Sequence, residues 1–62
     1  MDNDFDREAD LLYAYQFGQD AAKGNAEKIR AEFLLKFASD TEAEEQYQEG
    51  FSNQIAVNKK FN

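Results

Sequence analysis

Apolar side chains recur at every third or fourth position along most of the chain, which is the spacing of one face of an α-helix. This spacing predicts helices at residues 4–23, 26–38 and 42–58. Proline is absent and β-branched residues are few, while alanine, glutamate, glutamine, lysine and leucine are common, a composition that favours helix over strand. We therefore predict an all-α fold in which residues 1–62 form one small domain, with short connections that make successive helices antiparallel.

The helix predicted at 4–23 has two apolar faces rather than one. Tyr13, Phe17 and Ala21 share one face, at spacings of four residues. The broader face, at about 100° per residue, holds Phe5, Leu11, Leu12, Tyr15, Gly18 and Ala22. Because three short helices cannot bury one of their number on all sides, we expect the broader face to enter the core. Tyr13 and Phe17 then contribute to an interface with a partner, the alternative being that they pack loosely on the surface.

The other two predicted helices each carry one apolar stripe. On the second helix the stripe consists of Ala26, Ile29, Phe33 and Phe37, and on the third of Ala43, Tyr47, Phe51 and Ile55. The outer side of the second helix is expected to hold Lys28, Arg30, Glu32 and Lys36. Both helices are therefore predicted to pack through one face and to expose the other.

A Tyr-Gln-x-Gly sequence occurs twice, at residues 15–18 and 47–50, inside the two longest predicted helices. A glycine in a helix interior costs about 1 kcal/mol relative to alanine. Without a Cβ atom, however, it lets another backbone approach closely. Since the periodicity places both copies on core-facing sides, we interpret the repeat as a packing device. We predict that the first and third helices cross near Gly18 and Gly50.

The boundaries between the predicted helices carry local signals. Gly24 suits the left-handed position after a helix end, and Asn25 suits the N-cap of the next helix. A continuous helix through this point is the alternative. Before the third helix, two capping boxes fit the sequence: Ser39 with Glu42, or Thr41 with Glu44.

The composition of the 62 residues excludes several function classes. Cysteine and histidine are both absent, which removes disulfides, the usual zinc sites and nucleophilic mechanisms based on these residues. A net charge of −6 argues against nucleic-acid binding and against an anionic membrane as partner. The sequence contains no apolar run long enough to span a bilayer, and it contains no signal peptide. We therefore expect a cytoplasmic protein. The charge instead suits a partner protein with a basic surface.

Carboxylates are the remaining candidates for chemistry. Asp2, Asp4 and Asp6 resemble the start of a calcium-binding loop, but Arg7 and Tyr13 stand where that loop requires glycine and glutamate. Paired carboxylates for acid–base or two-metal catalysis also need a cleft, which so small a core can hardly provide. We therefore predict no catalytic residue, no metal site and no cofactor.

Two acidic stripes are candidate partner-binding features. Glu42, Glu45 and Glu49 lie at i, i+3 and i+7 on the third predicted helix, and Asp6 and Asp10 pair on the first. In one interpretation these stripes are solvated faces that keep the protein soluble. In the other, carboxylates one helical turn apart, about 5.4 Å, imitate the phosphates of nucleic acid, so that the protein occupies a basic groove on its partner.

Part of the chain resembles the ribosome modulation factor family. The matching residues are Gly18-Gln19-Asp20-Ala21 with Gly24, followed by Tyr47-Gln48-Glu49-Gly50-Phe51. The resemblance implies a helix pair that associates with the ribosome through its RNA. In general style, the chain is also similar to small, acidic, cysteine-free helical proteins encoded by phages, many of which bind and block a host protein.

These observations lead to one main hypothesis and two alternatives. The main hypothesis is a non-catalytic protein-binding module of the phage inhibitor type, which blocks a host nucleic-acid-handling or defence protein. Its partner-binding residues are the acids of both stripes together with Tyr13 and Phe17. One alternative is a regulatory or structural homodimer that completes its core by self-association, and the other is a ribosome-associated factor.

Overall fold

The computed structural model describes residues 3–60, with side chains described from Arg7 to Lys60. Its helices are α1 (Asn3–Lys23), α2 (Ala26–Lys36) and α3 (Thr41–Lys60). The predicted all-α, three-helix fold is confirmed, and the helix ends lie within two residues of their predicted positions. Differences of this size are ordinary because helix ends fray. The side chains of Phe5 and Asp6, which entered the predictions above, lie outside the described residues.

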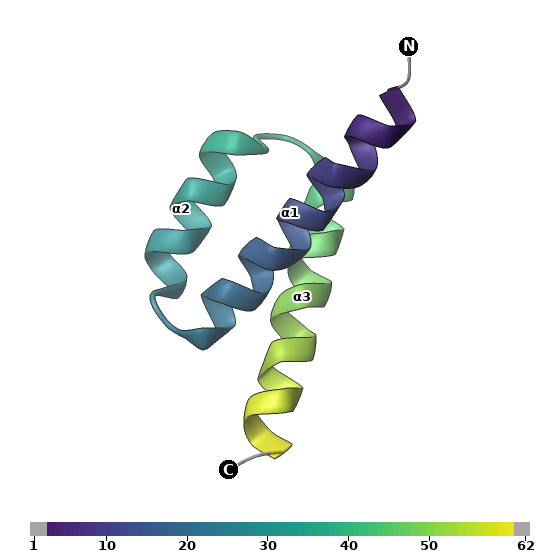
Figure 1. Ribbon diagram of the computed structural model, residues 1–62. Coiled ribbons are helices and arrows are strands. Elements are labelled where there is room, and N and C mark those ends of the chain that lie inside the picture. Colours follow the sequence, from purple (N-terminus) through teal and green to yellow (C-terminus); the bar gives the residue numbers. More distant parts are fainter. Residues whose placement is uncertain (1–2, 61–62) are drawn as a thin grey trace.

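α1 and α3 run in the same direction and cross, while α2 returns antiparallel to both (Figure 1). Side-chain hydrogen bonds link α1 with α3 and the turn before it at three levels: Arg7 to Asp40, Asn53 to Tyr15, and Asn58 to Ala22. The Cα atoms span 45 × 21 × 13 Å, so the molecule is elongated and thin. The starts of α1 and α3 therefore lie toward one end of the molecule and their last turns toward the other.

The crossing of α1 and α3 is a contact between two backbones. A Cβ atom on Gly18 would lie 2.8 Å from the backbone nitrogen of Phe51 and closer still to the carbonyl oxygen of Tyr47. A Cβ atom on Gly50 would lie 3.0 Å from the carbonyl carbon of Tyr15 and closer still to its oxygen. Only glycine fits at either position, so the predicted crossing near Gly18 and Gly50 is confirmed.

The second helix is attached through aromatic side chains rather than through its backbone. Phe33 of α2 is 1% exposed and is the largest fully buried side chain of the described residues. Its ring centroid lies 4.6 Å from that of Tyr47 on α3 and 5.9 Å from that of Phe17 on α1, which meets it edge-on. Phe37 adds a tilted contact at 5.2 Å. One ring thus joins all three helices.

The face of α1 that enters the core differs in part from the predicted one. Among the described side chains of α1, the buried ones are Ala14, Gly18 and Ala21, which form a stripe of small side chains at i, i+4 and i+7. Gly18 was predicted on this face, whereas Ala21 was predicted on the face of Tyr13 and Phe17. Leu12, predicted in the core, is 58% exposed, and Leu11 is only partly buried. The physical reason is the close crossing: α1 turns its smallest side chains toward α3, and its leucines are displaced to the flanks and the outer surface.

Both connections also differ in detail from the sequence interpretation. α1 ends at Lys23 as predicted, but Asn25 takes the left-handed conformation (φ 54°, ψ 39°) and makes no side-chain capping bond. Gly24 has φ 153°, also a conformation that favours glycine. Before α3, neither predicted capping box forms. Asp40 is the N-cap instead, because its Oδ1 accepts a hydrogen bond from the backbone N–H of Ala43 at 3.2 Å.

Arg30 was expected on the outer side of α2, and the structure places it inward. Its guanidinium lies 4.8 Å from the ring centroid of Tyr47 and 5.3 Å from that of Phe33. Its Nη2 also forms an ion pair with Glu44 of α3 at 2.8 Å. The long side chain reaches across the space between α2 and α3, which a short apolar residue at this position could not fill.

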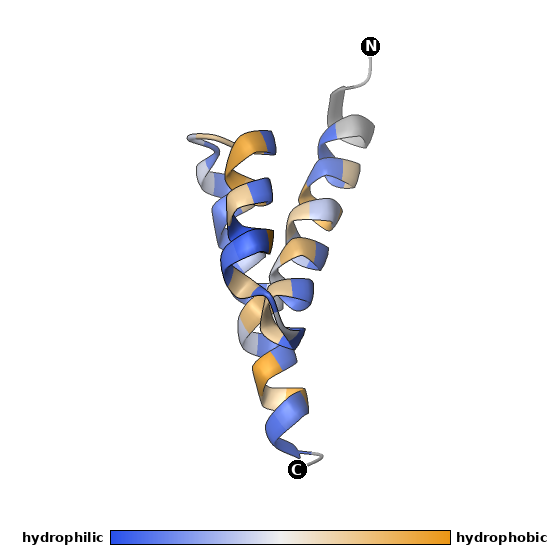
Figure 2. Cartoon of the chain, turned by 90° about the vertical axis from the view of Figure 1, so that its left-hand side faces the viewer, coloured by the Kyte–Doolittle hydropathy of each residue, from blue (hydrophilic) through white to orange (hydrophobic). Residues whose placement is uncertain are grey.

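Hydrophobic and hydrophilic segments alternate along all three helices (Figure 2). Of the residues that the structure describes, no helix is long and apolar enough to cross a membrane.

Candidate protein-binding surface

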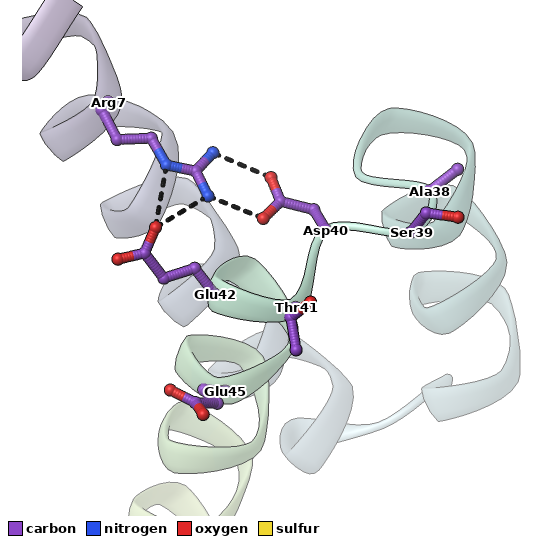
Figure 3. Close-up of a pocket in the computed structure, with 7 residues that line it drawn as sticks. All are labelled: Arg7, Ala38, Ser39, Asp40, Thr41, Glu42 and Glu45. Atoms are coloured by element: carbon purple, nitrogen blue, oxygen red, sulfur yellow. Dashed lines mark hydrogen bonds and ion pairs between the residues drawn. The ribbon is translucent and has the colours of Figure 1, made fainter.

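A cluster of charges joins the start of α1 to the connection that precedes α3 (Figure 3). The Arg7 guanidinium donates two hydrogen bonds to the carboxylate of Asp40, from Nη1 at 2.8 Å and from Nη2 at 2.6 Å. It also donates to Oε1 of Glu42, from Nη2 at 3.1 Å and from Nε at 3.3 Å. One arginine therefore binds two carboxylates, one of them in the bidentate geometry that arginine favours.

These contacts change the ionisation of the groups involved. Hydrogen bonds from Arg7 and from the backbone of Ala43 lower the pKa of Asp40 from 3.8 to about 2. The two carboxylates raise the pKa of Arg7 further above its ordinary value. A hydrogen bond from Gln48, with the ion pair to Arg30, lowers the pKa of Glu44. The charged forms of all three groups are therefore favoured in the folded state.

The acidic residues that were predicted to bind a partner differ in their contacts and in their exposure. Glu42 accepts both hydrogen bonds from Arg7 on Oε1, and its side chain is otherwise exposed. Glu45 and Glu49 are exposed on α3, and Asp10 is half-buried on α1. The side chain of Asp6 is not among those described. The stripe predicted on α3 therefore retains two exposed, uncommitted carboxylates.

The two aromatic residues that were predicted at an interface, Tyr13 and Phe17, differ in their exposure. Tyr13 is 55% exposed, with the ammonium group of Lys36 lying 5.8 Å from its ring centroid. Phe17 is half-buried and meets Phe33 and Phe37 edge-on, at 5.9 and 6.3 Å between ring centroids. Phe17 thus contributes to the attachment of α2, whereas Tyr13 presents its ring to solvent.

Leu12 is the surface residue that the sequence interpretation missed. The exposure of Leu12 follows from the orientation of α1. Because Ala14 and Gly18 face the core, Leu12 points outward beside Tyr13. Leu12, Tyr13, Ala9 and Gln16 line a shallow hollow of about 300 Å³ on α1. The signal that could have revealed this arrangement is the small-residue stripe of Ala14, Gly18 and Ala21, because small residues mark the side on which two helices approach most closely.

Among the side chains described, from Arg7 to Lys60, no group of three or more acidic residues is placed to hold a metal ion. The open hollow of about 630 Å³ around the Arg7 cluster is lined by Asp40 and Glu42, which Arg7 binds, and by the exposed Glu45, among others. No protein-family model matches the chain, and no curated protein and no solved structure matches it.

Proposed function

We propose that this chain is a non-catalytic protein-binding module whose partner presents an apolar side chain beside a basic surface. The observation that carries the proposal is the pair of adjacent large side chains, Leu12 and Tyr13, each more than half exposed on the outer side of α1. Tyrosine is enriched among the residues that contribute most to binding at protein interfaces, and binding hollows are lined mainly by hydrophobic and aromatic side chains. With both side chains exposed, the fold forgoes the stabilisation that their burial would supply, and a partner surface that covers them could recover it.

The charge of the chain indicates the chemistry of the partner. The protein carries a net charge of −6, and Glu45 and Glu49 are exposed carboxylates one helical turn apart. Acidic surfaces of this kind speed association with basic proteins by long-range attraction. The partner must offer both an apolar contact and a basic surface. The class of protein that best meets these two conditions has a basic groove for nucleic acid, and this chain would compete with the nucleic acid for that groove.

A crosslinking residue at position 13, in place of Tyr13, tests the proposal by trapping the partner for purification. With the purified partner, Tyr13→Ser and Leu12→Ser should each weaken binding by about tenfold or more, as expected for anchor residues. Leu35→Ser is the matched control, because Leu35 is the most exposed large apolar residue on α2. Equal losses from all three variants would show that the α1 surface has no special role.

Charge reversal tests the electrostatic part separately. Glu45→Lys with Glu49→Lys should slow association and flatten its dependence on salt. The same change of charge at Glu27 and Glu32, which are exposed on α2, is the control and should have a smaller effect. Reversal of Glu42 as well removes the whole predicted stripe, but it also breaks the contact with Arg7. Association kinetics that are identical in both pairs of variants would rule out steering by α3, and failure to displace nucleic acid from the partner would rule out competition.

A further inference from the structure

The crossing of α1 and α3 has two sides, and α2 covers only one of them. Phe17 of α1 packs against α2. Tyr15, two residues earlier, points to roughly the opposite side of α1. There it accepts a hydrogen bond from Nδ2 of Asn53 at 2.8 Å, which joins α1 to α3. A second groove, formed by α1 and α3 alone, runs along this side.

Two hollows that share Tyr15 make up this groove. The first, of about 420 Å³, lies toward the start of the helices and is lined by Leu11, Leu12 and Gln46, among others. The second, of about 450 Å³, lies toward their ends and includes Val57 and Lys60. Val57 is 45% exposed in it. Gln19, Asn53 and Gln54 also line the second hollow, so the groove is mainly apolar at Leu11 and Leu12 and mixed around Val57. None of the described helices covers it, and such a groove between two helices is a surface that a helix of another chain can cover.

The ends of the groove carry opposite charges, which follows from the parallel course of α1 and α3. Glu8 lines the groove at the end where both helices begin, and Glu42 lies on the first turn of α3 at that same end. Lys60 lines the groove at the other end. The last turn of α1, which ends at Lys23, reaches α3 there through the hydrogen bond from Asn58 to the carbonyl of Ala22. Two copies related by a two-fold axis near Tyr15 would run antiparallel. Each acidic end would then meet a lysine end.

The same two-fold axis matches the apolar parts of the groove. It brings Val57 of one copy over the hollow beside Leu11 and Leu12 of the other. The two-fold symmetry repeats this contact with the roles of the two copies exchanged. Such an interface is self-complementary, as a two-fold dimer requires. The macrodipoles of α1 and α3 in one copy also oppose those in the other, which is the favourable arrangement of neighbouring helices.

We infer that the occupant of this groove is a second copy of the chain, and that the protein forms an antiparallel homodimer through α1 and α3. The small core supports this inference: of the six hydrophobic residues that are buried in the described part of the chain, Ala14, Ala21 and Ala43 are alanines. A chain of 62 residues without cysteine has few other means of support. Because each copy carries a net charge of −6, long-range repulsion opposes association. We therefore expect a dimer that forms in the micromolar range.

The groove and the proposed partner surface share Leu12, but Val57 lies only in the groove and Tyr13 only in the partner surface, so variants at Val57 and Tyr13 distinguish the dimer from partner binding. Sedimentation equilibrium of the full chain, from micromolar to millimolar concentration, should show the mass rising from monomer to dimer. Val57→Asp should weaken self-association by at least about tenfold, since it places a charge in an apolar contact. Leu35→Asp, on the outside of α2, is the control and should leave the dimer intact. Far-UV circular dichroism checks that both variants keep their helices.

Charge exchange supplies a second test that does not depend on the apolar contact. Lys60→Glu and Glu8→Lys should each weaken the dimer, and the two changes together should restore part of the loss, because each acidic end then faces a matching basic end again. A wild-type chain that stays monomeric to millimolar concentration overturns the inference. The inference is also overturned if Leu35→Asp disrupts the dimer and Val57→Asp leaves it intact.

Discussion

The two helix contacts of this protein are built in opposite ways. Where α1 crosses α3, glycine and alanine bring two backbones together, and Gly18 and Gly50 leave no space for even one further carbon atom. Where α2 meets the other helices, long side chains fill the space, with Phe33 at the centre of rings from all three. The first contact should therefore fail when an atom is added, and the second when atoms are removed.

This difference follows from which parts can move. A backbone held in a helix cannot yield without breaking hydrogen bonds, so a crossing of backbones has one closest approach. Aromatic side chains can turn about their χ angles, and methylene stems such as that of Arg30 can bend, so the α2 contact can repack around a changed residue. The variants that follow test this contrast, in order of expected effect.

Phe33→Ala should have the largest effect, a loss of about 3–5 kcal/mol in the free energy of unfolding. The change removes the ring that contacts Phe17, Phe37 and Tyr47, so α2 loses its main attachment. Chemical denaturation followed by circular dichroism measures the loss. Phe33→Leu, which keeps most of the volume, should cost less than about 1.5 kcal/mol. A loss below that value for Phe33→Ala as well would mean that the ring cluster does not hold α2.

Gly18→Ala should destabilise the protein by about 2–3 kcal/mol, in the upper part of the usual range of about 1–3 kcal/mol for overpacking. This is the reverse of what helix propensity predicts, because alanine is better than glycine in a helix by about 1 kcal/mol. Gly50→Ala should behave alike, and the two changes together should cost less than their sum, since one already opens the crossing. Ser52→Ala, at an exposed position of α3, is the control, with an expected change within about 0.5 kcal/mol. Stabilisation by Gly18→Ala would contradict the crossing.

Asp40→Asn should change the dependence of stability on pH, with a smaller effect at neutral pH than either variant above. The pKa of Asp40 is lowered in the folded state, from 3.8 to about 2. Between these values the unfolded chain binds more protons than the folded one, so the contribution of Asp40 is complete above pH 4 and is lost as the pH falls toward 2. The lowered pKa of Glu44 adds to the same decline.

The melting temperature of wild type should therefore fall over this interval more steeply than that of Asp40→Asn, which keeps a capping side chain but no titrating group. Glu45→Gln removes a carboxylate from the same helix without touching Arg7, and serves as the control. Parallel pH profiles for wild type and Asp40→Asn would show that the contact between Arg7 and Asp40 does not persist in solution. In that case the start of α1 would be held by the crossing alone.

Tyr15→Phe should have the smallest effect, a loss below about 1 kcal/mol. The change removes only the hydrogen bond from Asn53 and keeps the ring. If the crossing of α1 and α3 rests on close packing of backbones, one exposed polar contact at its edge adds little. A loss as large as that of Gly18→Ala, measured in the same denaturation experiment, would instead assign the crossing to polar contacts.

Much of the fold could be read from local sequence. The three helices and the break at Gly24 and Asn25 depend on short-range spacing and on backbone preferences, and each was predicted close to its observed position. The crossing near Gly18 and Gly50 was also predicted, because an interior glycine is unfavourable unless a neighbouring backbone requires it. For the surface, the sequence identified Tyr13, Glu45 and Glu49 as candidates, and all three are exposed in the structure.

What only the tertiary structure decided is which face of α1 turns inward. A prediction from the spacing of apolar residues ranks Leu12 and Ala14 by hydrophobicity. It therefore places the leucine in the core. The two helices approach so closely at their glycines that size decides instead, and Ala14 is buried while Leu12 is exposed. The same closeness leaves α2 to be joined by long side chains, which explains why Arg30 points inward. Hydrophobic spacing is a property of one helix, whereas the distance between helices belongs to the pair.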